Sequence, residues 1–123
     1  MFVYISGPYS GPTLEDRLAN TEYAIHFYLV LIQKGYTPFC PHLTHFAHEY
    51  GLTKGIEIDY EEWMRQDLLW VEKCDVLLRL GPSPGANRER DHAINLLKPV
   101  FDSLDALLET YGDPYRSRKE KDE

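Results

Sequence analysis

Hydrophobic residues alternate along the chain between short extended runs and longer stretches with helical spacing. Short apolar runs rich in β-branched and aromatic residues predict four strands, at 2–6, 36–40, 75–80 and 99–101. Helical spacing predicts the segments between and after them as helices, at 13–34, 42–51, 59–73, 86–98 and 104–111. Strands separated by helices indicate a parallel sheet covered on both faces. We therefore expect a small three-layer α/β domain, Rossmann-like or flavodoxin-like, over residues 1–111.

Local signals support several of these boundaries. Thr13 with Asp16 forms a capping pattern at the start of the first helix, and Gly35 follows its end. Two sets of apolar residues each fall on one side of their helix, the first helix and the 86–98 helix. These sets are Leu18, Ile25, Leu29 and Ile32, and Ala86, Ala93, Leu96 and Leu97.

Composition places the chain among ordinary globular proteins. The 123 residues are 43% hydrophobic and 27% charged, and no apolar run reaches the ~20 residues of a membrane span. The first residues do not resemble a signal peptide, so we expect a cytoplasmic protein with no membrane partner and with Cys40 and Cys74 reduced. The polar tail at 112–123 is expected to be disordered.

A net charge of −7 argues against a nucleic-acid polymer as partner. It does not exclude a small anionic substrate, because local donors suffice to bind one. Two loops rich in Gly, Pro and Ser, 7–11 and 81–85, follow predicted strands and meet at the carboxyl edge of a parallel sheet. Neither loop has the pattern of a Walker A or dinucleotide-binding motif, and no serine stands in a nucleophile elbow.

Asp67 is the first carboxylate of interest. Tyr60, Trp63, Asp67 and Trp70 recur at helical spacing and share one face. A carboxylate within an aromatic stripe loses solvation, which raises its pKa. The alternative is an exposed aspartate that pairs with a neighbour such as Arg65 or Lys73.

Glu89 is the second carboxylate, placed by the pattern in the first turn of the 86–98 helix. There the helix dipole favours the ionised form, although a glutamate that merely complements the dipole fits the same pattern. An ionised and a protonated carboxylate together are typical of glycosidic cleavage, in which one attacks and the other protonates the leaving group.

Three histidines form the pattern H-x-x-H-x-x-H at 42, 45 and 48. Residues 42 and 48 diverge by roughly 120° on a helix, so one short helix presents three zinc ligands poorly. We expect these histidines to line a pocket or to have a structural role rather than to bind a metal ion.

Three segments resemble the nucleoside 2-deoxyribosyltransferase family and the related 2′-deoxynucleoside 5′-phosphate N-hydrolases. YISGPYSG at 4–11 is similar to the first strand and substrate loop of that family. RQDLLWVEKCDVLL at 65–78 resembles its Asp-Leu helix and the Asp-headed strand that follows, and SPGANRERDHA at 83–93 resembles the segment carrying its glutamate nucleophile. The resemblance implies a small parallel α/β domain assembled at least as a homodimer.

The resemblance also implies roles for individual residues. Glu89 matches the nucleophile, Asp67 the acid that handles the leaving base, and Tyr4 the tyrosine that orients the glutamate. The groups that match those holding a 5′-phosphate or the sugar are Gly7, Tyr9, Ser10, Gly11, Ser83 and Gly85. Trp63, Trp70 and the histidine segment with His45 are expected to stack on or enclose the base, unless these rings belong to the ordinary core. No metal or organic cofactor is needed.

The chain departs from the hydrolases in its first loop and beside the nucleophile. Ser10 stands where the hydrolases carry arginine, and Pro8 stands where they carry serine; Arg88 and Arg90 are additional cations that flank Glu89. The transferases often carry an acidic residue at the position of Ser83, which favours a hydrolase here.

The expected activity is therefore cleavage of the N-glycosidic bond of a (deoxy)ribonucleoside or its 5′-monophosphate by a glutamate nucleophile. Two alternatives stay open: a deoxyribosyltransferase that exchanges bases, and a non-catalytic domain that binds or senses nucleotides.

Overall fold

Four short parallel strands form the centre of the protein in this computed structural model, which describes residues 1–114. The strands are β1 (Phe2–Ser6), β2 (Thr37–Phe39), β3 (Val76–Arg79) and β4 (Val100–Phe101), in the spatial order β2-β1-β3-β4. The expectation for residues 115–123 of the tail lies outside the described residues. The predicted parallel α/β sheet is confirmed.

Helices connect the strands in the predicted order. They are α1 (Leu14–Gln33), the 3-10 turn η1 (Pro41–Leu43), α2 (Thr44–Thr53), α3 (Tyr60–Lys73), α4 (Pro84–Asn95) and α5 (Leu104–Tyr111). Thr13 and Asp16 cap each other at the start of α1, as the sequence indicated, and Asp59 and Ser103 cap α3 and α5. Among residues 1–114, no helix combines the length and the apolar character that a membrane span requires.

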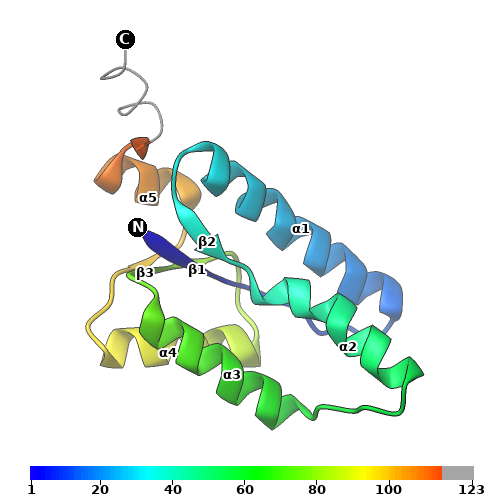
Figure 1. Cartoon of the computed structure of the whole chain (residues 1–123). Coiled ribbons are helices and arrows are strands. Elements are labelled where there is room, and N and C mark those ends of the chain that lie inside the picture. The colour runs from blue at the N-terminus through cyan, green and yellow to red at the C-terminus, as the bar shows by residue number, and fades with distance from the viewer. Residues whose placement is uncertain (115–123) are drawn as a thin grey trace.

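The helices form a layer on each face of the sheet (Figure 1). Val3, Ile5 and their neighbours on β3 pack against α1 and α5. Tyr4 and Leu77 point to the opposite face, where they pack against Val71 of α3 and Ala93 of α4. The alternation of side chains along β1 therefore sends Tyr4 toward the face covered by α3 and α4.

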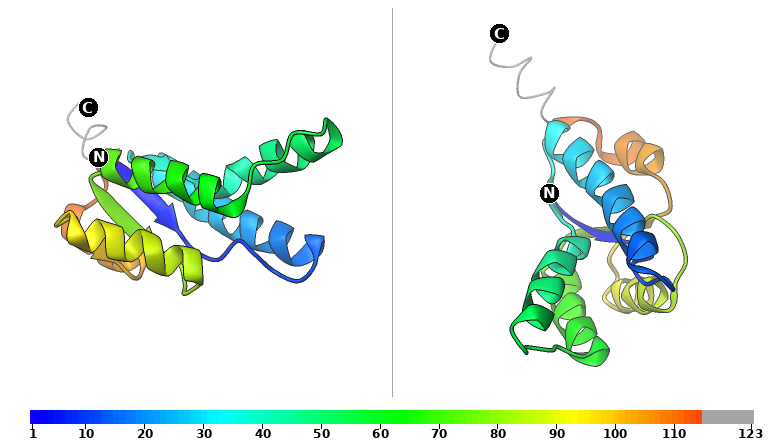
Figure 2. Two further views of the ribbon diagram at one scale, coloured as in Figure 1. Left: turned by 90° about the horizontal axis from the view of Figure 1, so that it is seen from below. Right: turned by 90° about the vertical axis from the view of Figure 1, so that its right-hand side faces the viewer.

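The order of the strands creates a crevice at one end of the sheet. From β1 the chain moves outward to β2 and then returns across β1 to β3, so the direction of winding reverses between β1 and β3. Ligands of such sheets bind at this reversal, outside the carboxyl ends of the strands. Figures 1 and 2 show α2 and the loop into α3 extending beyond this end of the sheet.

The apolar face of α1 indicated by the sequence is not the face that the structure buries. The residues of α1 that are buried are Thr21, Ala24 and Leu31, whereas Leu18, Leu29 and Ile32 are 38%, 54% and 46% exposed. Apolar residues occupy two sides of this helix, and the smaller Thr and Ala side chains face the sheet. The remaining leucines and isoleucines form an apolar stripe on the outside of the molecule.

The predicted boundaries and face of α4 also need correction. Pro84, not Ala86, is the first residue of the helix, because Ser83 is its N-cap and the fixed φ of proline suits the first position. The helix ends at Asn95, and Leu97 has a positive φ of 59° and is 92% exposed. Leu96 and Leu97 therefore lie outside the buried face, which consists of Ala86, Glu89 and Ala93.

Candidate active site

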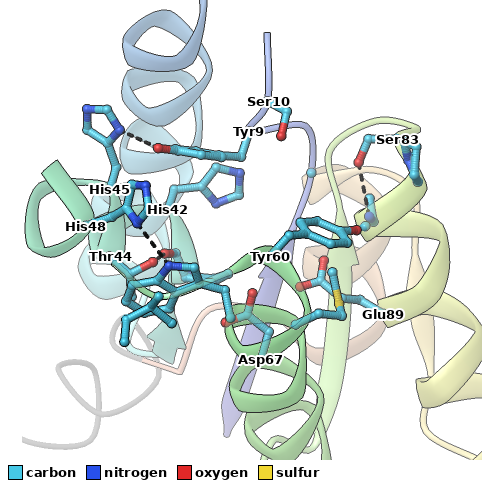
Figure 3. A pocket seen from close by; sticks show the side chains of 18 of the residues that line it. Tyr9, Ser10, His42, Thr44, His45, His48, Tyr60, Asp67, Ser83 and Glu89 are labelled. Carbon is cyan, nitrogen blue, oxygen red and sulfur yellow. Dashed lines mark hydrogen bonds between the residues drawn. The ribbon is translucent and has the colours of Figure 1, made fainter. Parts of the chain in front are cut away.

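A cavity of about 620 Å³ opens at the carboxyl ends of the strands (Figure 3). Three segments that each follow a strand contribute to it, and α3 closes the remaining side. The lining residues are Gly7, Tyr9, Ser10, Pro41, His42, Thr44, His45, His48, Glu57, Ile58, Asp59, Tyr60, Trp63, Met64, Asp67, Ser83, Pro84, Gly85, Ala86 and Glu89. The cavity therefore collects residues that are distant in sequence around the reversal between β1 and β3.

Glu89 is held from behind by two hydroxyl groups of β1. Its side chain is 5% exposed and reaches from α4 to the sheet. The hydroxyl of Tyr4 donates to Oε2, and Ser6 Oγ donates to Oε1 over 2.8 Å. Burial raises the pKa of Tyr4 well above its usual value, with a further contribution from Glu89, so the phenol stays a donor. Two donors from one rigid strand fix the orientation of the carboxyl group.

The expected charge state of Glu89 was wrong. Since α4 begins at Pro84, Glu89 lies in its second turn, beyond the first turn in which the helix dipole acts strongly. Burial instead raises the pKa of Glu89 to about 8, against the lowering effect of Tyr4 and Ser6, and the charge of Asp67 adds to the rise. Desolvation therefore outweighs the hydrogen bonds.

Asp67 faces the same cavity from α3. Burial raises the pKa of Asp67 to about 7, which confirms the rise expected from its aromatic surroundings. Arg65, a candidate ion-pair partner, is bound to Glu62 by contacts of 2.7 and 2.9 Å. No hydrogen bond to the Asp67 carboxyl group is found within residues 1–114. Figure 3 shows the Asp67 and Glu89 carboxyl groups directed toward the same part of the cavity.

The aromatic face of α3 is divided between the cavity and the core. Tyr60, Trp63 and Asp67 line the cavity, as their shared face predicted. Trp70 instead stacks on Phe39 of β2, with ring centroids 4.6 Å apart and an interplanar angle of 21°. Trp63 is thus the tryptophan available to a ligand.

The three histidines form the opposite wall of the cavity, each with its own partner. His42 Nε2 lies 3.1 Å from the carbonyl oxygen of Pro8, and His45 Nδ1 lies 2.6 Å from the hydroxyl of Tyr9. Trp63 Nε1 donates to His48 Nδ1 over 3.1 Å. In the described part of the chain, no three His, Cys, Asp or Glu side chains are grouped to hold a metal ion.

The two glycine-rich loops contribute unequally. Gly7, Tyr9 and Ser10 line the cavity, but Gly11 does not, and a Cβ at Gly11 would lie 2.5 Å from Asp16 Cβ. Gly11 therefore allows the loop to pack on the first turn of α1.

The second loop brings α4 against α3. Ser83 Oγ accepts from the N–H of Ala86 at 3.0 Å, so this hydroxyl caps the helix. A Cβ at Gly85 would lie 3.0 Å from Met64 Cε and 3.4 Å from the Tyr60 hydroxyl. Gly85 thus permits the approach of Tyr60 and Met64 at the mouth of the cavity.

Several residues of the site escaped the sequence analysis. Ser6 stands two residues after Tyr4 on the same face of β1, and this period of two was a usable signal for a second donor. Glu57 and Asp59 line the mouth from a segment between helices, where no periodicity predicts the direction of a side chain. Tyr60 was placed on the correct face, but its position over Gly85 depends on how α3 meets α4.

The fold and the cavity define a parallel α/β domain with the Asp67 and Glu89 carboxyl groups in a cavity at the carboxyl ends of its strands. The chain belongs to the family described as domain of unknown function DUF7768, whose model matches residues 1–102. Every residue that lines the cavity falls within this match. No curated protein matches the chain.

Proposed function

We propose that the protein is an N-glycosidase that cleaves the bond between base and sugar in a (deoxy)ribonucleoside or its 5′-monophosphate. The observation that carries the proposal is the buried Glu89, held by Tyr4 and Ser6 and facing the same cavity as Asp67. A rigidly held carboxylate beside a second carboxyl group of raised pKa suits glycosidic cleavage. The sequence resemblance to nucleoside deoxyribosyltransferases and their N-hydrolase relatives supports the same chemistry.

In the first step, an oxygen of ionised Glu89 attacks C1′ as the C1′–N bond breaks. The bonding electron pair leaves with the base, and an ester forms between Glu89 and the sugar. In the second step, water attacks C1′, the ester bond breaks and the Glu89 carboxylate is regenerated. The hydroxyls of Tyr4 and Ser6 keep the same carboxyl orientation through both steps.

Asp67 supplies the proton for a neutral leaving base. Two hydroxyls donate to Glu89, whereas no hydrogen bond in the described region supports a charge on Asp67. Burial favours the proton on Glu89, whose pKa is raised to about 8 against about 7 for Asp67. The reactive form is the other arrangement, with the proton on Asp67 and the charge on Glu89, and the Tyr4 and Ser6 hydroxyls stabilise that charge. After base departure, the Asp67 carboxylate accepts a proton from the attacking water.

The aromatic side of the cavity receives the base. Trp63 is oriented by its hydrogen bond to His48, and Tyr9 by its contact with His45. Flat rings held in this way provide stacking surfaces for a nucleobase. The sugar then lies between Tyr60 and the two carboxyl groups, near Ser10, Ser83 and Gly85.

The proposal includes a homodimer in a reducing, cytoplasmic compartment, acting without metal or organic cofactor and not on nucleic-acid polymers. The exposed apolar stripe of α1 supports self-association, since burying such residues is favourable. Cys40 and Cys74 are both free and buried, and burial raises the pKa of each thiol to about 11. Such thiols are unreactive, which suits a protein without disulfides.

Release of free base from a panel of nucleosides and 5′-monophosphates, separated by chromatography, tests the proposal. We expect release with the wild-type protein and at least about a thousandfold less with Glu89→Gln. Glu109→Gln, an exposed change on α5, serves as the matched control and keeps full activity. Binding without base release would identify a nucleotide-binding domain, and formation of a new nucleoside on adding a second base would identify a transferase.

A further inference from the structure

The cavity is lined by several acidic side chains. Glu57, Asp59, Asp67 and Glu89 all contribute to the lining, and none of the lining residues in the described chain is lysine or arginine. Two arginines lie behind lining residues and are paired there. Arg88 donates to Glu61 over 2.9 and 3.2 Å and lies 6.0 Å from the centre of the Tyr60 ring. Arg17 donates to the carbonyl of Gly11 over 3.3 Å and lies close to Tyr9.

The start of α4 offers few donors to an anion. Pro84 has no N–H, the N–H of Ala86 donates to Ser83 Oγ, and the N–H of Asn87 donates to the Ser83 carbonyl over 2.8 Å. Gly85 therefore holds the one backbone donor left over in this turn of the described structure. A phosphate group usually needs several such donors or a basic side chain.

His42 adds no positive charge to the histidine wall. Burial lowers the pKa of His42, which keeps this ring neutral near pH 7. Trp63 Nε1 donates to His48 Nδ1, which is the acceptor of this hydrogen bond. Glu57, Asp59 and the one negative charge that Asp67 and Glu89 share in the singly protonated pair therefore give the lining a net negative charge.

Aromatic faces accompany these carboxyl groups. Tyr9, Tyr60 and Trp63 line the same cavity, and aromatic faces attract cations through their quadrupoles. Rings and carboxylates around one space are the surroundings that stabilise a positively charged flat group, and they oppose a phosphate.

We propose that the preferred substrate is a nucleoside whose base carries a positive charge and whose sugar carries no phosphate. This inference rests on the proposed glycosidase function and names its substrate class. The charged ring stacks within the Tyr9 and Trp63 side of the cavity, and Glu57 and Asp59 at the mouth attract it on entry.

A positive base also simplifies the reaction. When Glu89 attacks C1′, the electron pair of the C1′–N bond neutralises the positive base, which leaves as a neutral molecule. No proton is then required from Asp67, whose carboxylate instead stabilises the cation before departure. Water resolves the ester as before, and one proton is released when the free sugar forms.

Binding to the inactive Glu89→Gln protein tests this preference without turnover. N1-methyladenosine, which is cationic at neutral pH, is compared by calorimetry with its neutral isomer N6-methyladenosine, and adenosine is compared with adenosine 5′-monophosphate. We expect the cation to bind about tenfold more tightly than its isomer at low salt, and the monophosphate to bind more weakly than adenosine. High salt should reduce both differences in affinity, the one between the cation and its neutral isomer and the one between adenosine and its monophosphate.

A double variant and a control variant test whether the acidic residues at the mouth cause the preference for the cation. Glu57→Gln with Asp59→Asn removes two charges while Asn still caps α3, and should reduce the preference for the cation about threefold. Glu109→Gln on α5 should leave it unchanged. Equal or tighter binding of the neutral isomer, or tighter binding of the monophosphate, would overturn the inference.

The experiments distinguish failure of the proposed glycosidase function from failure of the proposed substrate class. Suppose that the wild type releases base from neutral nucleosides or monophosphates, that Glu89→Gln does not, and that the cation is not preferred. The glycosidase proposal is then supported, and the proposed substrate class is refuted. Preference for the cation without base release by the wild-type protein refutes the glycosidase and leaves the binding preference standing.

Discussion

Replacing Glu89 with glutamine removes a carboxyl group whose ionisation the fold opposes. Glutamine has nearly the same shape and retains an oxygen that can accept from Tyr4 or Ser6. The change therefore removes the charge with little loss of packing. Because Glu89 is 5% exposed, its ionised form is almost completely removed from water.

The size of the effect follows from the pKa of Glu89. A value of about 8 in place of the usual 4.5 corresponds to about 5 kcal/mol at about 1.4 kcal/mol per pH unit. The folded state binds this proton more tightly than the unfolded state. The resulting stabilisation is fully present below pH 4.5 and is lost as the pH rises through about 8.

Urea unfolding followed by circular dichroism at pH 5, 7 and 9 measures this difference. Allowing for local relaxation, we expect Glu89→Gln to be more stable than wild type by at least about 2 kcal/mol at pH 9, and to differ by less than about 1 kcal/mol at pH 5. Glu109→Gln, exposed on α5, should follow the wild type at every pH. A glutamine variant that is equally or less stable at pH 9 would show that the Glu89 charge is well accommodated, which would refute the reasoning.

The other predictions concern catalysis and the start of α4. Activity on neutral nucleosides should follow a bell-shaped curve. It should rise with pH through about 7 as the Asp67–Glu89 pair loses its first proton, and fall above about 8 as the pair loses its second. Asp67→Asn should remove the alkaline limb of this curve, and a flat pH profile would contradict the scheme in which the two carboxyl groups share one proton. Tyr4→Phe should lower kcat about 10- to 100-fold and move the acid limb to higher pH, because one donor that favours ionised Glu89 is lost; an unchanged limb in steady-state assays would argue against this role. Ser83→Ala should cost about 1 kcal/mol of stability in urea unfolding through loss of the α4 cap, and the absence of any cost would argue against the cap.

The sequence predicted the layers of the fold well because proline, glycine and capping residues mark the ends of its elements. Thr13 and Asp16 marked the start of α1, and Gly35 marked its end. The buried face of α1 was missed because both sides of the helix carry apolar residues. Only contact with the sheet decides that Thr21 and Ala24 face inward.

The sequence also indicated both carboxylates, but it could not give the environment of Glu89. A shift of two residues in the start of α4 takes Glu89 out of the first turn, and its burial depends on the depth at which α4 packs against β1. The pKa of Asp67 was predicted correctly because its aromatic neighbours lie on the same helix. The acidic mouth at Glu57 and Asp59 depends on tertiary placement alone.

The nucleophilic role of Glu89 is tested most directly by mass spectrometry of the acid-quenched protein during turnover of a nucleoside that releases base. We predict an added sugar on the peptide that contains Glu89, present in the wild type and absent in Glu89→Gln. Base release that persists in Glu89→Gln, with no sugar attached to this peptide, would contradict the account.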